Sequence, residues 1–247
     1  MLTSARSLLA ATILAGSVFA AAPALAQEVG EFTVSGNATL VTDYRFRGIS
    51  LTDGDFAIQG GVDVVHSSGF YVGTWASSLE DSAVYGNAEL DIYAGWSGEV
   101  SSGLTLDAGV LYYAYPNGKD VAPANIWEPY ASISADLGPV SATVGAAYAW
   151  EQDSLGGDDN LYVYTDLGVG VPNTPISLAA HLGYTDGALS PKILTGTSTG
   201  GGFDWSIGAS YAITENLSFG VTYVGVQGDS IDSFSNDAVV ASIGFAF

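Results

Sequence analysis

Apolar residues alternate with polar or small residues along most of this chain, and this period of two limits what the chain can fold into. In segments 88–97, 104–113, 140–148 and 176–184, the even positions hold apolar residues and the odd positions hold mostly polar or small ones. Such alternation predicts β-strands with one apolar face, and we find no amphipathic helix with a period of 3.6. The chain after residue 26 also lacks the 18 consecutive apolar residues of a transmembrane helix.

The alternation predicts twelve strands, most of them about as long as the 9–11 residues that a tilted strand needs to cross a bilayer. The predicted strands are 32–44, 56–66, 70–79, 87–97, 104–115, 127–137, 140–150, 161–171, 176–185, 203–212, 217–227 and 238–247.

The predicted connections alternate in length. Short turns are expected at 67–69, 97–103, 138–139, 172–175 and 213–216. Longer loops are expected at 45–55, 80–86, 116–126, 151–160, 186–202 and 228–237. Short periplasmic turns alternating with longer external loops are typical of outer-membrane barrels with an even strand number. The expected fold is therefore all-β, a transmembrane antiparallel up-and-down β-barrel of about twelve strands.

The two ends of the sequence predict export to the bacterial outer membrane. Residues 1–26 have a basic Arg6, an apolar stretch and the small-residue pattern Ala24-Leu25-Ala26, which together predict a secretory signal peptide. The barrel is then a single domain spanning 27–247. The last predicted strand ends on Phe247, as expected of a closing strand that the barrel-assembly machinery recognises. Expected partners in the membrane are lipid and lipopolysaccharide.

Composition excludes two broad classes. The segment after residue 26 has four basic residues against 26 acidic ones, a net charge of −22, which excludes nucleic acid as a partner because phosphate binding needs basic residues. The chain also has 14 Tyr, 10 Phe and 5 Trp, whereas disordered acidic chains are poor in aromatic residues. There is no cysteine, phosphate loop, metal-binding Cys/His cluster or dinucleotide fingerprint, so no cofactor is expected.

Charged residues of the predicted strands fall on the face opposite the apolar one, which we expect to line a water-filled lumen. They are Asp43, Asp63, Glu89, Asp91, Asp107, Glu128, Asp136, Asp166 and Asp204. Four tyrosines could line the same path as a sliding surface for sugars or nucleosides: Tyr93, Tyr113, Tyr162 and Tyr164. Because rings of carboxylates favour cations, we expect a channel for small polar or cationic solutes.

Arg45 and Arg47 share the inward parity of Asp43. They form either an arginine ladder facing the acidic wall at a constriction, or two salt bridges to wall or loop carboxylates, and the two interpretations are compatible. Other aromatic residues near strand ends predict interfacial girdles on the apolar face: Tyr44, Trp96, Tyr112, Tyr148, Trp150, Tyr184, Trp205, Tyr211, Tyr223 and Phe245.

An enzyme is the less favoured interpretation. A barrel hydrolase needs a histidine beside a nucleophile or carboxylate, and the sequence shows no such partner pattern near His66 or His181. The acidic external loops could bind divalent cations, but a solvated anionic rim is the favoured explanation. A structural or adhesive barrel with an occluded lumen would show the same strand pattern as a channel. The solute, the choice between monomer and homo-oligomer, and any inward folding of loop 186–202 stay open.

Three motifs resemble a known family. They are DYRFRGIS at 43–50, followed by TDGD at 52–55 and AIQGG at 57–61; HSSGFYVGTW at 66–75; and ELDIYAG at 89–95. In these motifs the chain resembles the proteobacterial TorF-type porins, long classed as conserved hypothetical proteins. The resemblance is densest from about 34 to 115. It implies an outer-membrane barrel that acts as a pore, and it implies no particular substrate or catalytic residue.

Overall fold

The computed structural model describes residues 27–119, 121–197 and 200–247. Its elements are β1 (Gln27–Val29), β2 (Phe32–Val41), β3 (Arg45–Phe46), β4 (Ile49–Ser50), β5 (Ala57–His66), β6 (Phe70–Ser82), β7 (Gly86–Ser101), β8 (Leu104–Ala114), β9 (Ile126–Leu137), β10 (Val140–Ala149), η1 (Asp153–Leu155), β11 (Asn160–Gly170), β12 (Ile176–Gly187), α1 (Pro191–Leu194), β13 (Gly202–Ala212), β14 (Leu217–Val226) and β15 (Ala238–Ala246).

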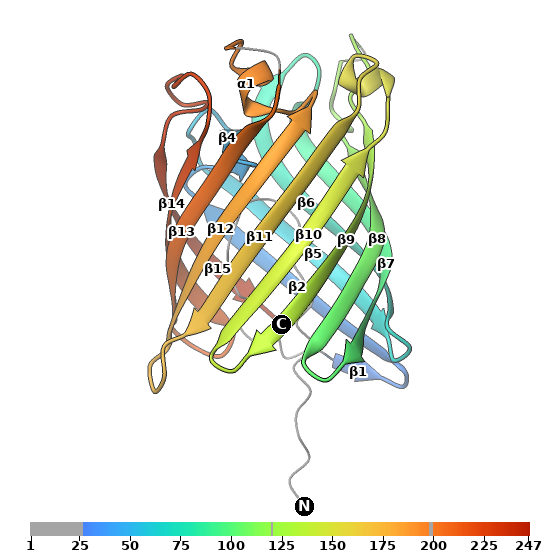
Figure 1. The fold of residues 1–247 in the computed structure, drawn as a ribbon, viewed down its shortest axis with the longest axis vertical. Helices are drawn as coiled ribbons and strands as arrows, with labels where there is room; N and C mark the ends of the chain where they lie inside the picture. Colours follow the sequence, from blue (N-terminus) through green and yellow to red (C-terminus); the bar gives the residue numbers. More distant parts are fainter. Residues whose placement is uncertain (1–26, 120, 198–199) are drawn as a thin grey trace, which may run out of the picture.

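Antiparallel pairing closes the sheet into a barrel (Figure 1). Strands β5 to β15 follow one another in chain order around the barrel. Strand β2 closes the ring because it pairs with both β5 and β15. The short β1 pairs only with β2, so the closed barrel has twelve strands. Phe247 completes the closure, because its backbone N–H donates to Gly36 O at 3.0 Å and its carbonyl accepts from Gly36 N at 2.9 Å.

The predicted fold class is confirmed, and each of the twelve predicted strands corresponds to a barrel strand whose ends differ by no more than four residues. Two connections are markedly shorter than predicted. The predicted loop 80–86 is reduced to residues 83–85 because β6 extends to Ser82. The predicted turn 97–103 is reduced to residues 102–103 because β7 continues through Ser101. Both strands are therefore longer than their alternation indicated.

The two faces of the barrel wall differ in chemistry. Apolar side chains project outward, and Ile58, Val144 and Ile207 are 71, 65 and 63% exposed. Carboxylates of the barrel strands project inward, and Glu89, Asp91 and Glu128 are almost fully buried. A barrel in water would place these faces the other way round, so the outer face is suited to lipid.

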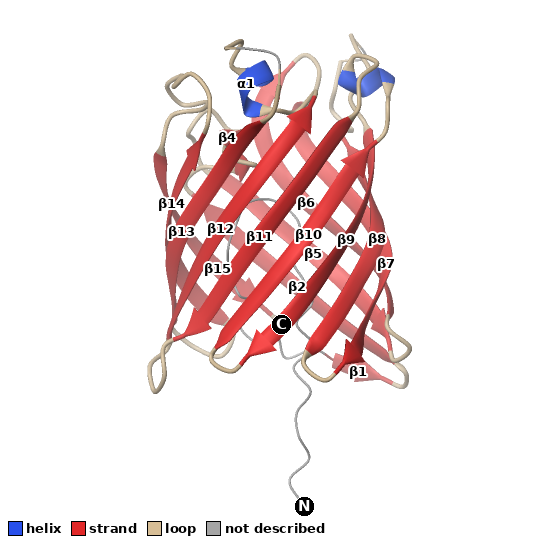
Figure 2. Cartoon of the chain, viewed as in Figure 1, coloured by secondary structure: helices blue, strands red, loops and turns tan. Residues whose placement is uncertain are grey.

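Short turns lie at one end of the barrel and the longer loops at the other (Figure 2). The long-loop end, the upper end in the figure, carries η1 and α1. The C-terminal Phe247 lies toward the short-turn end. Neither helical element in the described ranges is long and apolar enough to cross a membrane.

The outward position of Val144, near the middle of β10, leads to a first prediction. A Val144→Lys substitution should lower the free energy of unfolding in lipid vesicles by about 2–4 kcal/mol, because a basic side chain at the bilayer midplane is costly. The matched control is Thr143→Lys, one residue earlier on the lumen face, which should cost much less. Urea unfolding of both variants measures the difference, and equal losses would contradict the face assignment.

Candidate functional site: the lumen and its inner loop

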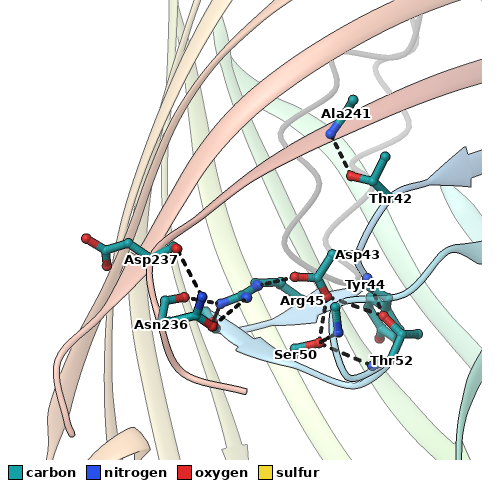
Figure 3. Close-up of polar contacts among 11 residues, drawn as sticks. Thr42, Asp43, Tyr44, Arg45, Ser50, Thr52, Asn236, Asp237 and Ala241 are labelled. Atoms are coloured by element: carbon teal, nitrogen blue, oxygen red, sulfur yellow. Dashed lines mark hydrogen bonds and ion pairs between the residues drawn. The ribbon is translucent and has the colours of Figure 1, made fainter. Parts of the chain in front are cut away.

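Residues 42–52 of the connection between β2 and β5, here called the inner loop, fold into the barrel, whereas residues 53–56 are exposed (Figure 3). The prediction of an external loop at 45–55 is therefore wrong for residues 45–52. Tyr44, Ile49 and Thr52 are each only about 3% exposed. The inner loop contains the β3–β4 hairpin, in which Arg45 pairs with Ser50 and Phe46 with Ile49.

The tip of this hairpin is a two-residue turn formed by Arg47 and Gly48. Both have positive φ values, 48° and 84°, as a type I′ hairpin turn requires. Glycine adopts this conformation without steric cost. A Cβ atom on Gly48 would also lie 2.8 Å from the Cβ atom of Val226 on β14, so the tip approaches the barrel wall too closely for a larger residue.

Asp43 organises the base of the inner loop. One of its carboxylate oxygens accepts from Ser50 Oγ at 2.6 Å, and the other forms an ion pair with Arg45 Nε at 2.6 Å. Arg45 also donates to the backbone carbonyl of Asn236, in the loop between β14 and β15, at 2.6 Å (Figure 3). The base is thus fastened to the neighbouring external loop.

Arg47 anchors the tip of the inner loop to the opposite wall. Its Nη2 lies 2.8 Å from both carboxylate oxygens of Glu128 on β9, and its guanidinium lies 4.1 Å from the ring centre of Tyr162 on β11. In the ring of twelve strands, β9 and β11 flank β10, which lies opposite β2. The inner loop therefore crosses the whole lumen.

The side of the inner loop packs on β6, β7 and β8. Tyr44 donates to Glu89 on β7 at 3.1 Å, and its ring meets Trp75 on β6 edge to face at 5.4 Å. Phe46 makes a similar contact with Tyr113 on β8 at 5.8 Å. The prediction that Tyr44 belongs to the outer aromatic girdle is wrong. The chain leaves the sheet after Val41, so alternation no longer determines where its side chains point.

Burial differs between the two halves of the lumen. Toward the long-loop end, Glu89, Asp91 and Glu128 are 1–2% exposed beneath the inner loop. Toward the short-turn end, the lumen-facing Asp63, Tyr93 and Asp166 keep part of their surface exposed. The inner loop therefore fills the external half and leaves the other half wider.

Tyrosine–aspartate pairs line this wider half. Tyr93 donates to Asp63 at 2.5 Å, and Tyr71 donates to Asp107 at 2.8 Å. Farther round the wall, Tyr164 stacks on Tyr162 at 5.5 Å. Asp136 stands apart from these contacts, as an exposed residue near the short-turn end of β9.

Some lumen residues were missed by the sequence analysis. Tyr71, Trp75 and Tyr130 have the inward parity of their strands, so the same alternation could have found them. The hydroxyls of Tyr71 and Tyr130 lie 2.5 Å apart, which joins β6 to β9 within the lumen.

His181 on β12 lies between two carboxylates, which the sequence pattern near this histidine did not indicate. Its Nδ1 is 2.6 Å from Asp166 on β11, and its Nε2 is 3.0 Å from Asp204 on β13. These partners sit on neighbouring strands, so they are distant in sequence. A ring that donates to both carboxylates is protonated, because neutral imidazole has one N–H. His66, at the short-turn end, contacts Ser68 and Glu31.

The arrangement offers binding chemistry more than catalysis. The hydroxyl of Tyr162 lies 2.7 Å from His181 Nε2. Within the described ranges no serine or threonine hydroxyl hydrogen-bonds to this ring. Nor do three or more His, Cys, Asp or Glu side chains converge as a metal site anywhere in those ranges. The lumen is thus a polar, mostly acidic channel wall crossed by a cationic tip.

A closed twelve-stranded antiparallel barrel with an apolar outside and a charged inside has the fold of outer-membrane porins. The chain belongs to the family described as bacterial protein of unknown function (Gcw_chp), whose model matches residues 25–244. That description gives no activity, so the TorF-type designation is not confirmed by it. None of the curated proteins matches the chain.

Two solved porins have a similar fold. The NanC porin in a rhombohedral crystal form superposes with a TM-score of 0.60 at 11% identity, covering 87% of this chain and 98% of that one. The KdgM porin in complex with disordered oligogalacturonate superposes with a TM-score of 0.56 at 10% identity, covering 87% and 97%. At these identities the likeness concerns the fold alone.

The buried ion pair at the tip of the inner loop leads to a second prediction. Arg47→Gln should lower the free energy of unfolding by about 3–5 kcal/mol, because Glu128 would remain buried without its cation. The double variant Arg47→Gln with Glu128→Gln should recover most of the loss. Denaturant unfolding of the single and double variants tests the coupling. Additive losses would show that the pair contributes little.

Proposed function

We propose that this protein is an outer-membrane channel through which small polar or cationic solutes diffuse passively. The observation that carries this proposal is the pairing of a lipid-suited outer face with an acidic half-lumen, where Asp63 and Asp166 stay partly accessible. Arg45, Arg47 and His181 balance only part of the lumen's carboxylate charge. Because carboxylate rings favour cations, such a lumen should prefer them.

The inner loop is the constriction of this channel. It crosses the lumen from β2 to β9 and β11, so a solute must pass beside it or displace it. The tyrosines that face the wider half, such as Tyr93 and Tyr164, give flat surfaces along which hydroxylated solutes could slide. The proposal includes assembly into the outer membrane by the barrel-assembly machinery, with lipid and lipopolysaccharide around the outer face.

One observation favours a second candidate, a structural barrel with an occluded lumen. The inner loop contacts the wall on all sides, at β6, β7, β8, β9 and β11 and at the loop between β14 and β15. If these contacts persist in the membrane, the barrel passes nothing. The two candidates differ in conductance.

Planar-bilayer recording separates them. We expect the refolded protein to give discrete conductance steps with a cation-selective reversal potential under a salt gradient. A variant in which residues 45–50 are replaced by a Gly-Ser linker should give larger steps, because the constriction is removed. Heat-modifiable gel mobility controls for folding of both proteins. Silence from folded wild-type protein, with steps only in the shortened variant, would establish the occluded barrel.

The wall carboxylates should set the selectivity. Replacing Asp63 and Asp107 by Asn keeps the oxygen acceptors for Tyr93 and Tyr71 but removes two charges from the lumen. The reversal potential should move toward zero, while the step size changes less. Asp158→Asn, at an exposed position in the loop between β10 and β11, is the matched control. A reversal potential equal to that of wild type would refute selection by these carboxylates.

A further inference from the structure

Glu89 and Asp91 form a buried acidic pair on the lumen face of β7. They lie two residues apart, so both side chains point into the same part of the lumen, and each is 1% exposed. Glu89 Oε2 and Asp91 Oδ1 have no hydrogen-bond partner among the described residues. Two buried acceptors therefore lie on the same face of β7 without a hydrogen-bond donor among the described residues.

The pair also lacks a compensating cation. The neighbouring buried carboxylates of the lumen each have one: Asp43 has Arg45, Glu128 has Arg47, and Asp204 has His181. In the part of the chain that the structure describes, no Lys, Arg or His forms an ion pair with Glu89 or Asp91. A buried carboxylate without a partner costs several kcal/mol, so a pair of them favours an external cation or a shared proton.

The surroundings of the pair are aromatic. Asp91 lies directly between Trp75 on β6 and Tyr113 on β8 in the sheet register, and both side chains are buried on the lumen side. Tyr44 of the inner loop covers the pair and donates to the other oxygen of Glu89. Aromatic faces attract ammonium groups, and carboxylates accept their N–H donors.

The same surroundings do not suit a divalent metal. Calcium takes six to eight oxygen ligands, and no third carboxylate or imidazole converges with this pair in the described ranges. A primary ammonium needs only a few acceptors, and the two free carboxylate oxygens supply two of them.

We propose that Glu89 and Asp91 form a binding site for the ammonium group of a small organic amine, beneath the inner loop and between Trp75 and Tyr113. The inference rests on the proposed channel in one respect, because the amine reaches the site through the lumen. It makes amines the favoured class of solute, and it places their binding step at the constriction.

Equilibrium dialysis of the refolded full chain in detergent micelles, with labelled methylammonium as the probe, tests the site. Wild-type protein should bind it saturably at constant ionic strength. The variant Glu89→Gln with Asp91→Asn should bind at least about tenfold more weakly, because two charged acceptors are lost. The matched control, Asp158→Asn with Asp232→Asn, removes two carboxylates from exposed loop positions and should bind as wild type does. Gel mobility checks that all three are folded.

Each other outcome overturns the proposal. Equal binding by the Glu89/Asp91 variant would place the amine elsewhere, and complete displacement by an equal concentration of Na⁺ would show a site for any monovalent ion. Absence of binding in folded wild-type protein would mean that the pair shares a proton. Dialysis needs no current, so a barrel that binds methylammonium but does not conduct would keep the site and refute the channel. Conductance without methylammonium binding would keep the channel and refute the site.

Discussion

Closure of the hydrogen-bonded sheet is the constraint on which the rest of this structure depends. A bilayer offers no partner for a free N–H or C=O group, so every strand needs a neighbour on both sides. β2 meets this need twice, through β15 and β5, and the exchange of two hydrogen bonds between Phe247 and Gly36 extends the seam to the last residue. Once the ring is closed, alternate side chains must face lipid or lumen. The position of each carboxylate on the wall follows from its parity.

The inner loop depends on the same closure in a different way. A closed barrel of twelve strands encloses a polar space that its own wall side chains do not fill, and the inner loop occupies part of it. Asp43 holds the base through Ser50 and Arg45, and Arg47 holds the tip through Glu128. At the tip the loop carries a cation where the wall carries Glu128, and at the base Arg45 pairs with Asp43 of the loop itself. An apolar loop would leave Glu128 buried without a cation.

The sequence predicted the strands of the barrel wall better than the inner loop and the contacts inside the lumen, and the reason is physical. Lipid on one side imposes a period of two on every strand, so Glu89, Asp91 and Asp204 could be placed from parity alone. The inner loop obeys no period. Tyr44 was placed on the outside by extending the parity of β2 three residues beyond Val41, where the sheet has ended.

The partners of His181 were missed for a related reason. Asp166 and Asp204 lie beside it only through the register of three strands, which single-strand patterns do not give. The sequence did carry one local signal for the hairpin. Arg47-Gly48 can form a two-residue turn, but without knowledge of the lumen nothing indicates that the turn points inward.

The position of that turn determines the electrostatics of the constriction. Among the residues that the structure describes, three cationic side chains form ion pairs in the lumen, Arg45, Arg47 and His181, and two of them belong to the inner loop. Arg47 brings its charge to Glu128 on β9, from a tip whose Gly48 fits closely against Val226. Glu89 and Asp91 lie on the other side of the loop, beside Tyr44, where no arginine reaches. The loop therefore neutralises one wall and leaves the other acidic. This asymmetry follows from a single hairpin of fixed length. A cation in the lumen would be attracted to the wall that carries Glu89 and Asp91, because no arginine forms an ion pair there.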